Sequence, residues 1–233
     1  MLSPYRPPRS EGIHYLFARL SNPMPKHFLL RLLTLFCGLS LLSFGVALSI
    51  RSNLGTSPIS SVPYVFSYIF PLSVGVLTII LHAIFILIQM AILGKQFQMI
   101  QWLQLVVGIV FGVFIDVALW LTQSIDIQQY VYQMSVSLIS CVITAIGVIL
   151  QVKARLIYLA GEGVYQAFAI RFHKNYGSVK TYGDVILVAF AAFSSYLVLH
   201  QLIGIREGTI ISAFLIGTLI RTMMPKFSFL DFK

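Results

Sequence analysis

Six long apolar runs are the feature of this sequence that most constrains its fold. An α-helix needs about 20 apolar residues, at about 1.5 Å each, to cross the hydrocarbon core of a bilayer. The predicted spans are Phe28–Ile50, Leu72–Leu93, Ile100–Leu121, Val131–Val152, Asp184–Ile203 and Gly208–Met224. The sequence therefore predicts an all-α polytopic membrane protein with six transmembrane helices.

The composition excludes the other broad classes. Hydrophobic residues make up 58% of the 233 residues and charged residues only 10%, whereas a soluble chain has about 25% charged residues. Disordered chains are poor in apolar residues, so disorder is excluded as well. The net charge of +9 is interpreted as basic loops at one membrane face. The expected partner is the lipid bilayer and not nucleic acid.

The Lys and Arg residues also predict the orientation. With the N-terminus inside, fourteen of the 16 Lys and Arg residues fall on the inner side, and only Arg51 and Arg206 fall on the outer side. Positive charge is enriched in cytoplasmic loops, so both termini are expected in the cytoplasm. The predicted parts are a basic tail at residues 1–27, a single transmembrane domain at 28–224 and a C-terminal tail at 225–233.

The sequence contains a weak internal repeat. A shift of about 102 residues places Gly45-Val46 over Gly147-Val148. Each half then reads as a span, an interrupted segment and two further spans. Because each half has an odd number of spans, the second enters the membrane from the opposite side. We therefore expect an inverted 3+3 repeat with two interrupted or re-entrant segments, an arrangement typical of transporters. The halves are residues 28–121 and 131–224, and the interrupted segments are Arg51–Pro71 and Lys153–Arg171.

The first interrupted segment is a candidate substrate-binding site. Gly55 permits unusual backbone angles, and Ser57 followed by Pro58 predicts a helix start, with Pro63 kinking or ending that helix. Its free N–H groups would suit a small polar or anionic solute. An outer loop with an interfacial helix is the alternative. The candidate residues are Asn53, Gly55, Thr56, Ser57 and Pro58.

The second interrupted segment contains Gly161-Glu162-Gly163 within apolar sequence. A carboxylate at membrane depth is costly and usually faces the interior of the bundle with a partner. Glu162 is therefore a candidate for ion coupling, proton carriage or substrate contact. The alternative is an interfacial carboxylate paired with Lys153 or Arg155.

Two charge pairs are expected across the halves. Asp116 on the third span lies towards the outer side, where it can meet Arg51, and Arg221 on the sixth lies towards the inner side, where it can meet Glu162. These residues are candidates for gating, with a purely structural pair as the alternative. His82 is a weaker candidate for a proton relay.

No nucleophile–base arrangement, phosphate loop or metal-ligand cluster stands out in the sequence. We therefore predict no enzyme activity, no cofactor and no metal site. Cys37 and Cys141 lie in apolar runs and are interpreted as small hydrophobic residues.

Four separated stretches resemble the YczE/YitT-like family of bacterial integral membrane proteins. They are GVALSIRSNLGTSPISSVPY at 45–64, FGVFID at 111–116, LAGEGV at 159–164 and GIREGTIISAFLIGTLIR at 204–221. The resemblance implies a multi-pass protein of five to six spans in the bacterial cytoplasmic membrane. It does not imply a substrate or a reaction.

Two functions remain open at this stage. The first is a small-solute transporter or a membrane solute-binding subunit. The alternative is a scaffold or accessory protein that recruits a cytoplasmic partner through a basic inner face, including Arg171 to Lys174. The sequence leaves a homo-oligomer open in both cases.

Overall fold

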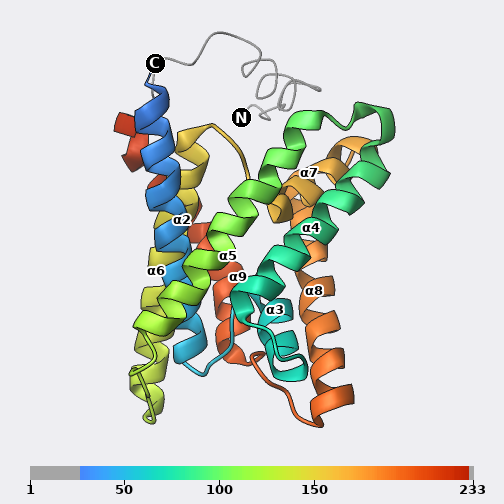
Figure 1. Cartoon of the computed structure of the whole chain (residues 1–233). Helices are drawn as coiled ribbons and strands as arrows, with labels where there is room; N and C mark the ends of the chain where they lie inside the picture. Colours follow the sequence, from blue (N-terminus) through green and yellow to red (C-terminus); the bar gives the residue numbers. More distant parts are fainter. Residues whose placement is uncertain (1–26, 231–233) are drawn as a thin grey trace, which may run out of the picture.

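The structure is a computed structural model that describes residues 27–230 of the chain. The predicted basic tail lies outside the described residues, apart from His27. The described part is all-helical, without strands, and its long helices run side by side as one bundle (Figure 1).

Six helices are long and apolar enough to cross a membrane, as the sequence predicts. They are α2 (Phe28–Arg51), α4 (Val74–Leu93), α5 (Leu103–Leu121), α6 (Tyr130–Ala154), α8 (Tyr176–Leu199) and α9 (Glu207–Met223). Short 3₁₀ turns at Gly94–Gln96 and Met99–Trp102 connect α4 to α5, and a further turn at Met224–Leu230 follows α9.

Two further helices are half as long as the spans. They are α3 (Pro58–Ile69) and α7 (Ala160–Arg171), each of 12 residues. At about 1.5 Å per residue each covers about 18 Å, which is too short for a hydrocarbon core of about 30 Å. They occupy the two interrupted segments of the sequence.

One predicted boundary is wrong by a wide margin. The fifth span begins at Tyr176 and not at Asp184, because Asn175 caps the helix by accepting a hydrogen bond from the N–H of Gly177. Lys180, which the sequence suggested for a loop, is inside α8, where carboxylates compensate its charge.

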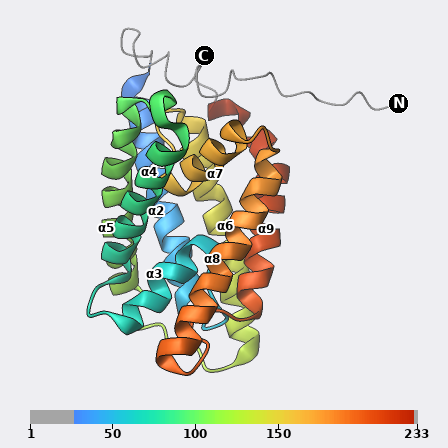
Figure 2. The ribbon, with the colours of Figure 1, turned by 90° about the vertical axis from the view of Figure 1, so that its right-hand side faces the viewer.

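The two half-length helices lie at opposite ends of the bundle. We call the end where α2 begins and α9 ends the terminal end, and the opposite end the far end. In both views α3 lies towards the far end and α7 towards the terminal end (Figures 1 and 2).

The helices pack in matched pairs. The α2 and α6 helices form the main contact of the bundle, α2 also packs on α5, and α6 on α9. Each half-length helix packs on a long helix of the other half of the chain, α3 on α8 and α7 on α4. The half-length helices thereby tie the two halves together.

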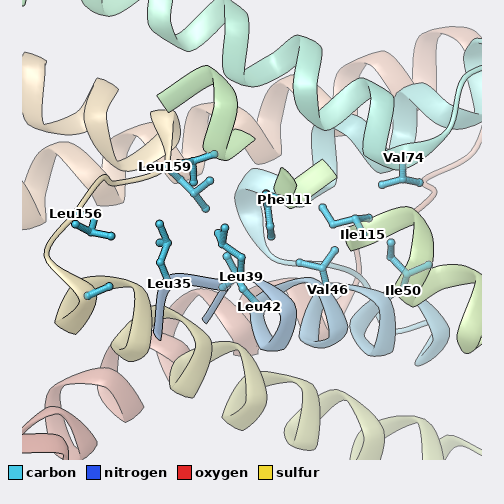
Figure 3. Packing of buried hydrophobic residues seen from close by; sticks show 12 residues of the cluster. Leu35, Leu39, Leu42, Val46, Ile50, Val74, Phe111, Ile115, Leu156 and Leu159 are labelled. Atoms are coloured by element: carbon cyan, nitrogen blue, oxygen red, sulfur yellow. The ribbon is translucent and has the colours of Figure 1, made fainter. Parts of the chain in front are cut away.

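The main apolar core lies between α2 and the helices that cover it. Leu39, Leu42 and Val46 of α2 point towards Phe111 and Ile115 of α5 (Figure 3). These side chains are buried, and between helices in a bilayer such contacts are stabilised by close van der Waals packing rather than by removal of apolar surface from water.

The α8 helix is the least covered of the spans. Apart from α3 and α7 it has almost no contact with other helices, and only Ala191 and Ser195 are buried among its residues. Residues with a left-handed backbone flank it at both ends, His173 with φ of 52° and His200 with φ of 55°.

Candidate functional site

The two half-length helices begin beside each other inside the bundle. A Cβ placed on Gly161, the second residue of α7, would lie 3.2 Å from Cδ1 of Ile59, the second residue of α3. From there α3 runs towards the far end and α7 towards the terminal end (Figure 2). Helix amino termini carry partial positive charge, so two such ends meet here. We call residues 56–61 and 159–163 the central junction.

The chain turns back before each short helix through left-handed residues. Asn53 (φ 56°) and Gly55 (φ 104°) precede α3, and Arg155 (φ 51°) precedes α7. The N-cap residues Ser57 and Leu159 are both extended, with ψ of 153° and 149°. The two breaks therefore have similar backbone conformations despite different side chains.

The predicted helix start at Ser57-Pro58 is confirmed, with Ser57 as the N-cap and Pro58 in the first turn. The Ser57 side chain does not cap the helix, because its Oγ donates to Oγ of Ser60 at 3.0 Å. The helix also continues through Pro63 to Ile69. Since proline has no N–H, the carbonyl of Ile59 lacks its usual helical donor.

Thr56 lies directly before this helix and is fully buried. Its backbone N–H donates to the carbonyl of Gly204 at 3.1 Å, but its Oγ1 has no hydrogen-bond partner among the described residues. A buried hydroxyl without a partner costs about 1–3 kcal/mol. A group of this kind is expected to meet a ligand or water.

Two glutamines line the other side of the central junction. Nε2 of Gln89 on α4 donates to Oε1 of Gln104 at 2.9 Å and to the carbonyl of Ala160 at 3.1 Å. A Cβ on Gly163 would lie 2.7 Å from Oε1 of Gln89, so a larger residue there would displace the glutamine side chains. Gln89 is fully buried, and its Oε1 has no partner in the described part of the chain.

Glu162 belongs to a charge cluster between α7 and α8. It accepts hydrogen bonds from the hydroxyl of Tyr176 and from Nζ of Lys180, the latter at 3.2 Å. Nζ of Lys180 is also 3.6 Å from Asp184, which accepts a 2.7 Å bond from the hydroxyl of Tyr165. These five residues, the α7–α8 charge cluster, combine two carboxylates with one ammonium group and carry one excess negative charge.

The cluster is partly exposed. The side chains of Lys180 and Glu162 are 35% and 32% accessible, and that of Asp184 is 17% accessible. Lys180 also lies over the ring of Tyr165, 5.1 Å from its centroid. The charges therefore have access to a polar medium or to a further charged group.

The structure does not bring Arg51 and Asp116 together. Asp116 instead accepts hydrogen bonds from Oγ of Ser73 at 2.6 Å and from the N–H of Gly75 at 2.8 Å. Arg51 donates to the carbonyl of Leu119 at 2.9 Å. Asp116 thus neutralises the amino terminus of α4, where a carboxylate is favoured.

The second expected pair is not formed either. Arg221 is exposed near the end of α9, and no ion pair joins it to another described residue. Its expected partner Glu162 binds Lys180 and Tyr176 instead.

His82 is buried in an aromatic setting. Its ring lies between those of Phe85 and Phe111, with centroids 6.4 Å and 5.8 Å away. Its Nδ1 has no partner within the described residues, and a Cβ on Gly108 would approach this atom to 2.8 Å. No described contact joins His82 to Glu162, so a proton relay stays a prediction.

Three hydrogen bonds close the far end between the first break and the connection from α8 to α9. They run from Thr56 N to Gly204 O (3.1 Å), from Gly208 N to Leu54 O (2.8 Å) and from Arg206 Nη1 to Asn53 O (3.1 Å). A Cβ on Gly55 would contact Oγ1 of Thr209, so these segments are in direct contact. We call this the far-end seam.

The structure therefore brings some of the sequence candidates together and separates others. Gly161 and Gly163 lie at the central junction with Thr56, Ser57 and Pro58, while Glu162 points into the charge cluster. Sequence reasoning missed the partners Gln104, Lys180 and Asp184. The spacing of Lys180 and Asp184, one helical turn apart, was an available signal. No group of three His, Cys, Asp or Glu residues suited to a metal lies within residues 27–230.

Comparison with known proteins gives a family and no function. The model of one protein family, described as a family of unknown function, matches residues 29–225. This match covers almost all of the described helices. No curated protein and no solved structure matches the chain.

Proposed function

Because the chain belongs to DUF6198, a family of unknown function, we propose its function from the geometry of the central junction. The proposed function is that of a membrane carrier, or a membrane solute-binding subunit, for a small polar or anionic solute. The solute would bind where α3 and α7 meet.

The observation that carries this proposal is the meeting of two uncapped helix starts beside unpartnered polar atoms. Neither Ser57 nor Leu159 caps its helix with a side chain. By contrast, Ser73 and Asn175 cap α4 and α8. Unpartnered atoms of Thr56 and Gln89 lie beside the two uncapped starts. Non-helical backbone at membrane depth is tolerated where it faces protein or a water-filled path.

Element positions support the inverted repeat that such a carrier would use. The helices α2, α3 and α4 begin at Phe28, Pro58 and Val74, and α6, α7 and α8 each begin 102 residues later. Paired interruptions at matching positions of two halves indicate a transport site.

Contacts between α2 and α6 support the same repeat. A Cβ on Gly45 would lie 3.0 Å from the nitrogen of Thr144, and one on Gly147 would lie 2.6 Å from the nitrogen of Leu42. Adding 102 to Gly45 and Leu42 gives Gly147 and Thr144. The contact is thus reciprocal, as expected for two halves related by a twofold axis.

The charge distribution supports the proposed orientation. Lys95 lies in the connection from α4 to α5, Arg171 ends α7 and Lys226 follows α9, all at the terminal end, whereas Arg51 ends α2 and Arg206 precedes α9 at the far end. We therefore assign the terminal end to the cytoplasm. Placement in the bacterial cytoplasmic membrane, and a relationship to the YczE/YitT-like family, rest on the four resembling stretches and stay predictions.

A flux assay on the full chain in liposomes tests the carrier. Nitrate would serve as the anionic probe, read by an entrapped dye, and glycerol as the neutral probe, read by light scattering. We expect one probe to cross faster than in protein-free liposomes. Thr56→Val, which removes the unpartnered hydroxyl, is expected to lower this flux about tenfold, since one hydrogen bond of about 1.4 kcal/mol corresponds to that factor.

The matched control is Thr218→Val, the same change at an exposed position of α9. It is expected to leave the flux unchanged. The carrier is refuted if neither probe crosses faster than in protein-free liposomes, or if Thr56→Val and Thr218→Val behave alike.

One observation favours the scaffold alternative. Arg171, His173 and Lys174 are exposed at the terminal end and offer a basic surface to a cytoplasmic partner. A partner recovered by cross-linking from native membranes, and lost on changing these residues to Ser, would support a scaffold. Intact recovery after those changes would count against it.

A further inference from the structure

In the first half of the chain, the last two spans, α4 and α5, pack closely against each other. A Cβ on Gly112 of α5 would lie 2.6 Å from the carbonyl of Gly75 on α4, and one on Gly108 would lie 2.8 Å from His82. The Gln89–Gln104 bond continues this contact towards the terminal end. The α4 and α5 helices are therefore packed along most of their length.

The corresponding helices of the second half are apart. By chain position α8 and α9 correspond to α4 and α5, yet they have almost no contact. Between α5 and α9 the shift is 105 residues, which places Gly217 over Gly112 and Arg221 over Asp116. No heavy atom of the described residues lies within 4 Å of a Cβ placed on Gly217. Gly177, the counterpart of Gly75, meets only Oδ1 of its own N-cap residue Asn175 at 3.2 Å.

The loops that connect the helices also differ between the two ends of the bundle. At the far end the seam joins the first break to the connection between α8 and α9. The corresponding segments at the terminal end are residues 155–158 and 98–104. Within the described chain no backbone hydrogen bond joins these two segments. The backbone hydrogen bonds of the far-end seam therefore have no counterpart between these two described segments.

Charge also distinguishes the two pairs of helices. The α7–α8 charge cluster has one excess negative charge and is partly exposed. Arg221 of α9 corresponds to Asp116 of α5, which contacts the first turn of α4. If α9 packed on α8 as α5 packs on α4, Arg221 would lie against the first turns of α8, beside Glu162. The cluster would then be neutral.

We propose that α8 and α9 form the gate of the central junction at the terminal end, and that Arg221 is its charge latch. The structure is the conformation open to the terminal end. In the second conformation α8 and α9 pack as α4 and α5 do here, Arg221 pairs with Glu162, and the α4–α5 contact opens. This inference deepens the proposed carrier function and rests on it.

A cysteine cross-link tests the gate. Gly112 packs on Ile79 of α4, with a Cβ 2.6 Å from Cγ1, and their counterparts are Gly217 and Thr181. The double variant Thr181→Cys/Gly217→Cys, in a chain with Cys37→Ala and Cys141→Ala, is expected to form a disulfide on oxidation in liposomes. The control pair Tyr182→Cys/Gly217→Cys differs by one residue, about 100° around α8, and is expected to form none.

The latch is tested on the same cross-link. Arg221→Gln is expected to lower the rate of disulfide formation about fivefold, which corresponds to about 1 kcal/mol. Arg221→Lys is expected to retain most of the rate, and so is Lys226→Gln, which removes a nearby exposed cation. Elution of every variant as a single species in detergent controls for folding.

The outcomes separate the gate from the carrier. No disulfide from Thr181→Cys/Gly217→Cys, or equal rates for it and the control pair, overturns the gate. Equal rates for Arg221→Gln and Lys226→Gln overturn the latch. If the disulfide forms but neither nitrate nor glycerol crosses the membrane, the gate is supported and transport of those probes is refuted. If flux persists in the fully cross-linked protein, the carrier function is supported and the gate is overturned.

Discussion

The two ends of the bundle differ in how their long helices meet. At the far end, Gly75 and Gly112 touch and Asp116 binds the start of α4. At the terminal end, Gly177 and Gly217 touch no other helix of residues 27–230, and Arg221 forms no ion pair with a described residue.

This difference shows that glycines allow two helices to pack closely but do not by themselves hold the helices together. Both pairs of helices, α4 with α5 and α8 with α9, contain glycines, and only α4 and α5 pack closely against each other. The closely packed pair, α4 and α5, also has a polar contact between the helices. The carboxylate of Asp116 on α5 accepts a hydrogen bond from the N–H of Gly75 at the start of α4, where a negative charge is favoured. The α7–α8 charge cluster has two carboxylates and one ammonium group, and the proposed gate would bring the charge of Arg221 to it.

The largest contrast is expected between Gly112 and Gly217. Gly112→Leu places a side chain against the carbonyl of Gly75, 2.6 Å from the Cβ position, and overpacking of this kind costs about 1–3 kcal/mol or more. Gly217→Leu has open space and is expected to be nearly neutral. Thermal unfolding of both variants in the same detergent measures the contrast. Equal midpoints would contradict the difference between the two helix pairs.

A smaller contrast is expected between Asp116 and Arg221. Asp116→Ala removes a bond from the exposed Ser73 hydroxyl and one from the partly buried N–H of Gly75. Because both bonds are partly accessible, the expected loss is about 1.5 kcal/mol in total, the low end for bonds to a charged group. Arg221→Gln changes an exposed residue and is expected to alter stability by less than about 0.5 kcal/mol. Chemical denaturation of the purified variants measures both. A larger loss for Arg221→Gln would reverse the assignment of the closed end.

The smallest contrast concerns the helix starts. Ser73 accepts a bond from the N–H of Val76 at 3.1 Å, so Ser73→Ala is expected to cost about 1 kcal/mol. Ser57 makes no such bond, and Ser57→Ala is expected to cost less. Hydrogen exchange of the first turns of α4 and α3 reads the local effect. Similar increases in both turns would show that Ser57 caps α3 in the membrane.

Much of this architecture follows from the sequence. The six spans follow from apolar length, and the two breaks follow from Gly55, Pro58 and the glycines around Glu162. These signals are local, because they depend on chain length and backbone freedom. The start of α8 was missed because Lys180 was interpreted as a loop residue, although Glu162 and Asp184 compensate it in the fold.

The partners of the charged residues could not be predicted in the same way. Asp116 and Arg51 lie at the same end of the bundle, yet Asp116 binds a helix start and Arg51 a carbonyl. Which partner each charged side chain binds depends on the rotation of each helix about its axis and on the unpaired backbone groups at helix ends. The pair of Gln89 and Gln104 depends on the same rotation.

The sparse packing of α8 has a mechanical consequence. It is held almost only by α3 near one end and α7 near the other, and the chain bends sharply at His173 and His200 on either side. Because these are almost its only helix contacts, a tilt of α8 would change its packing against α3 and α7 together.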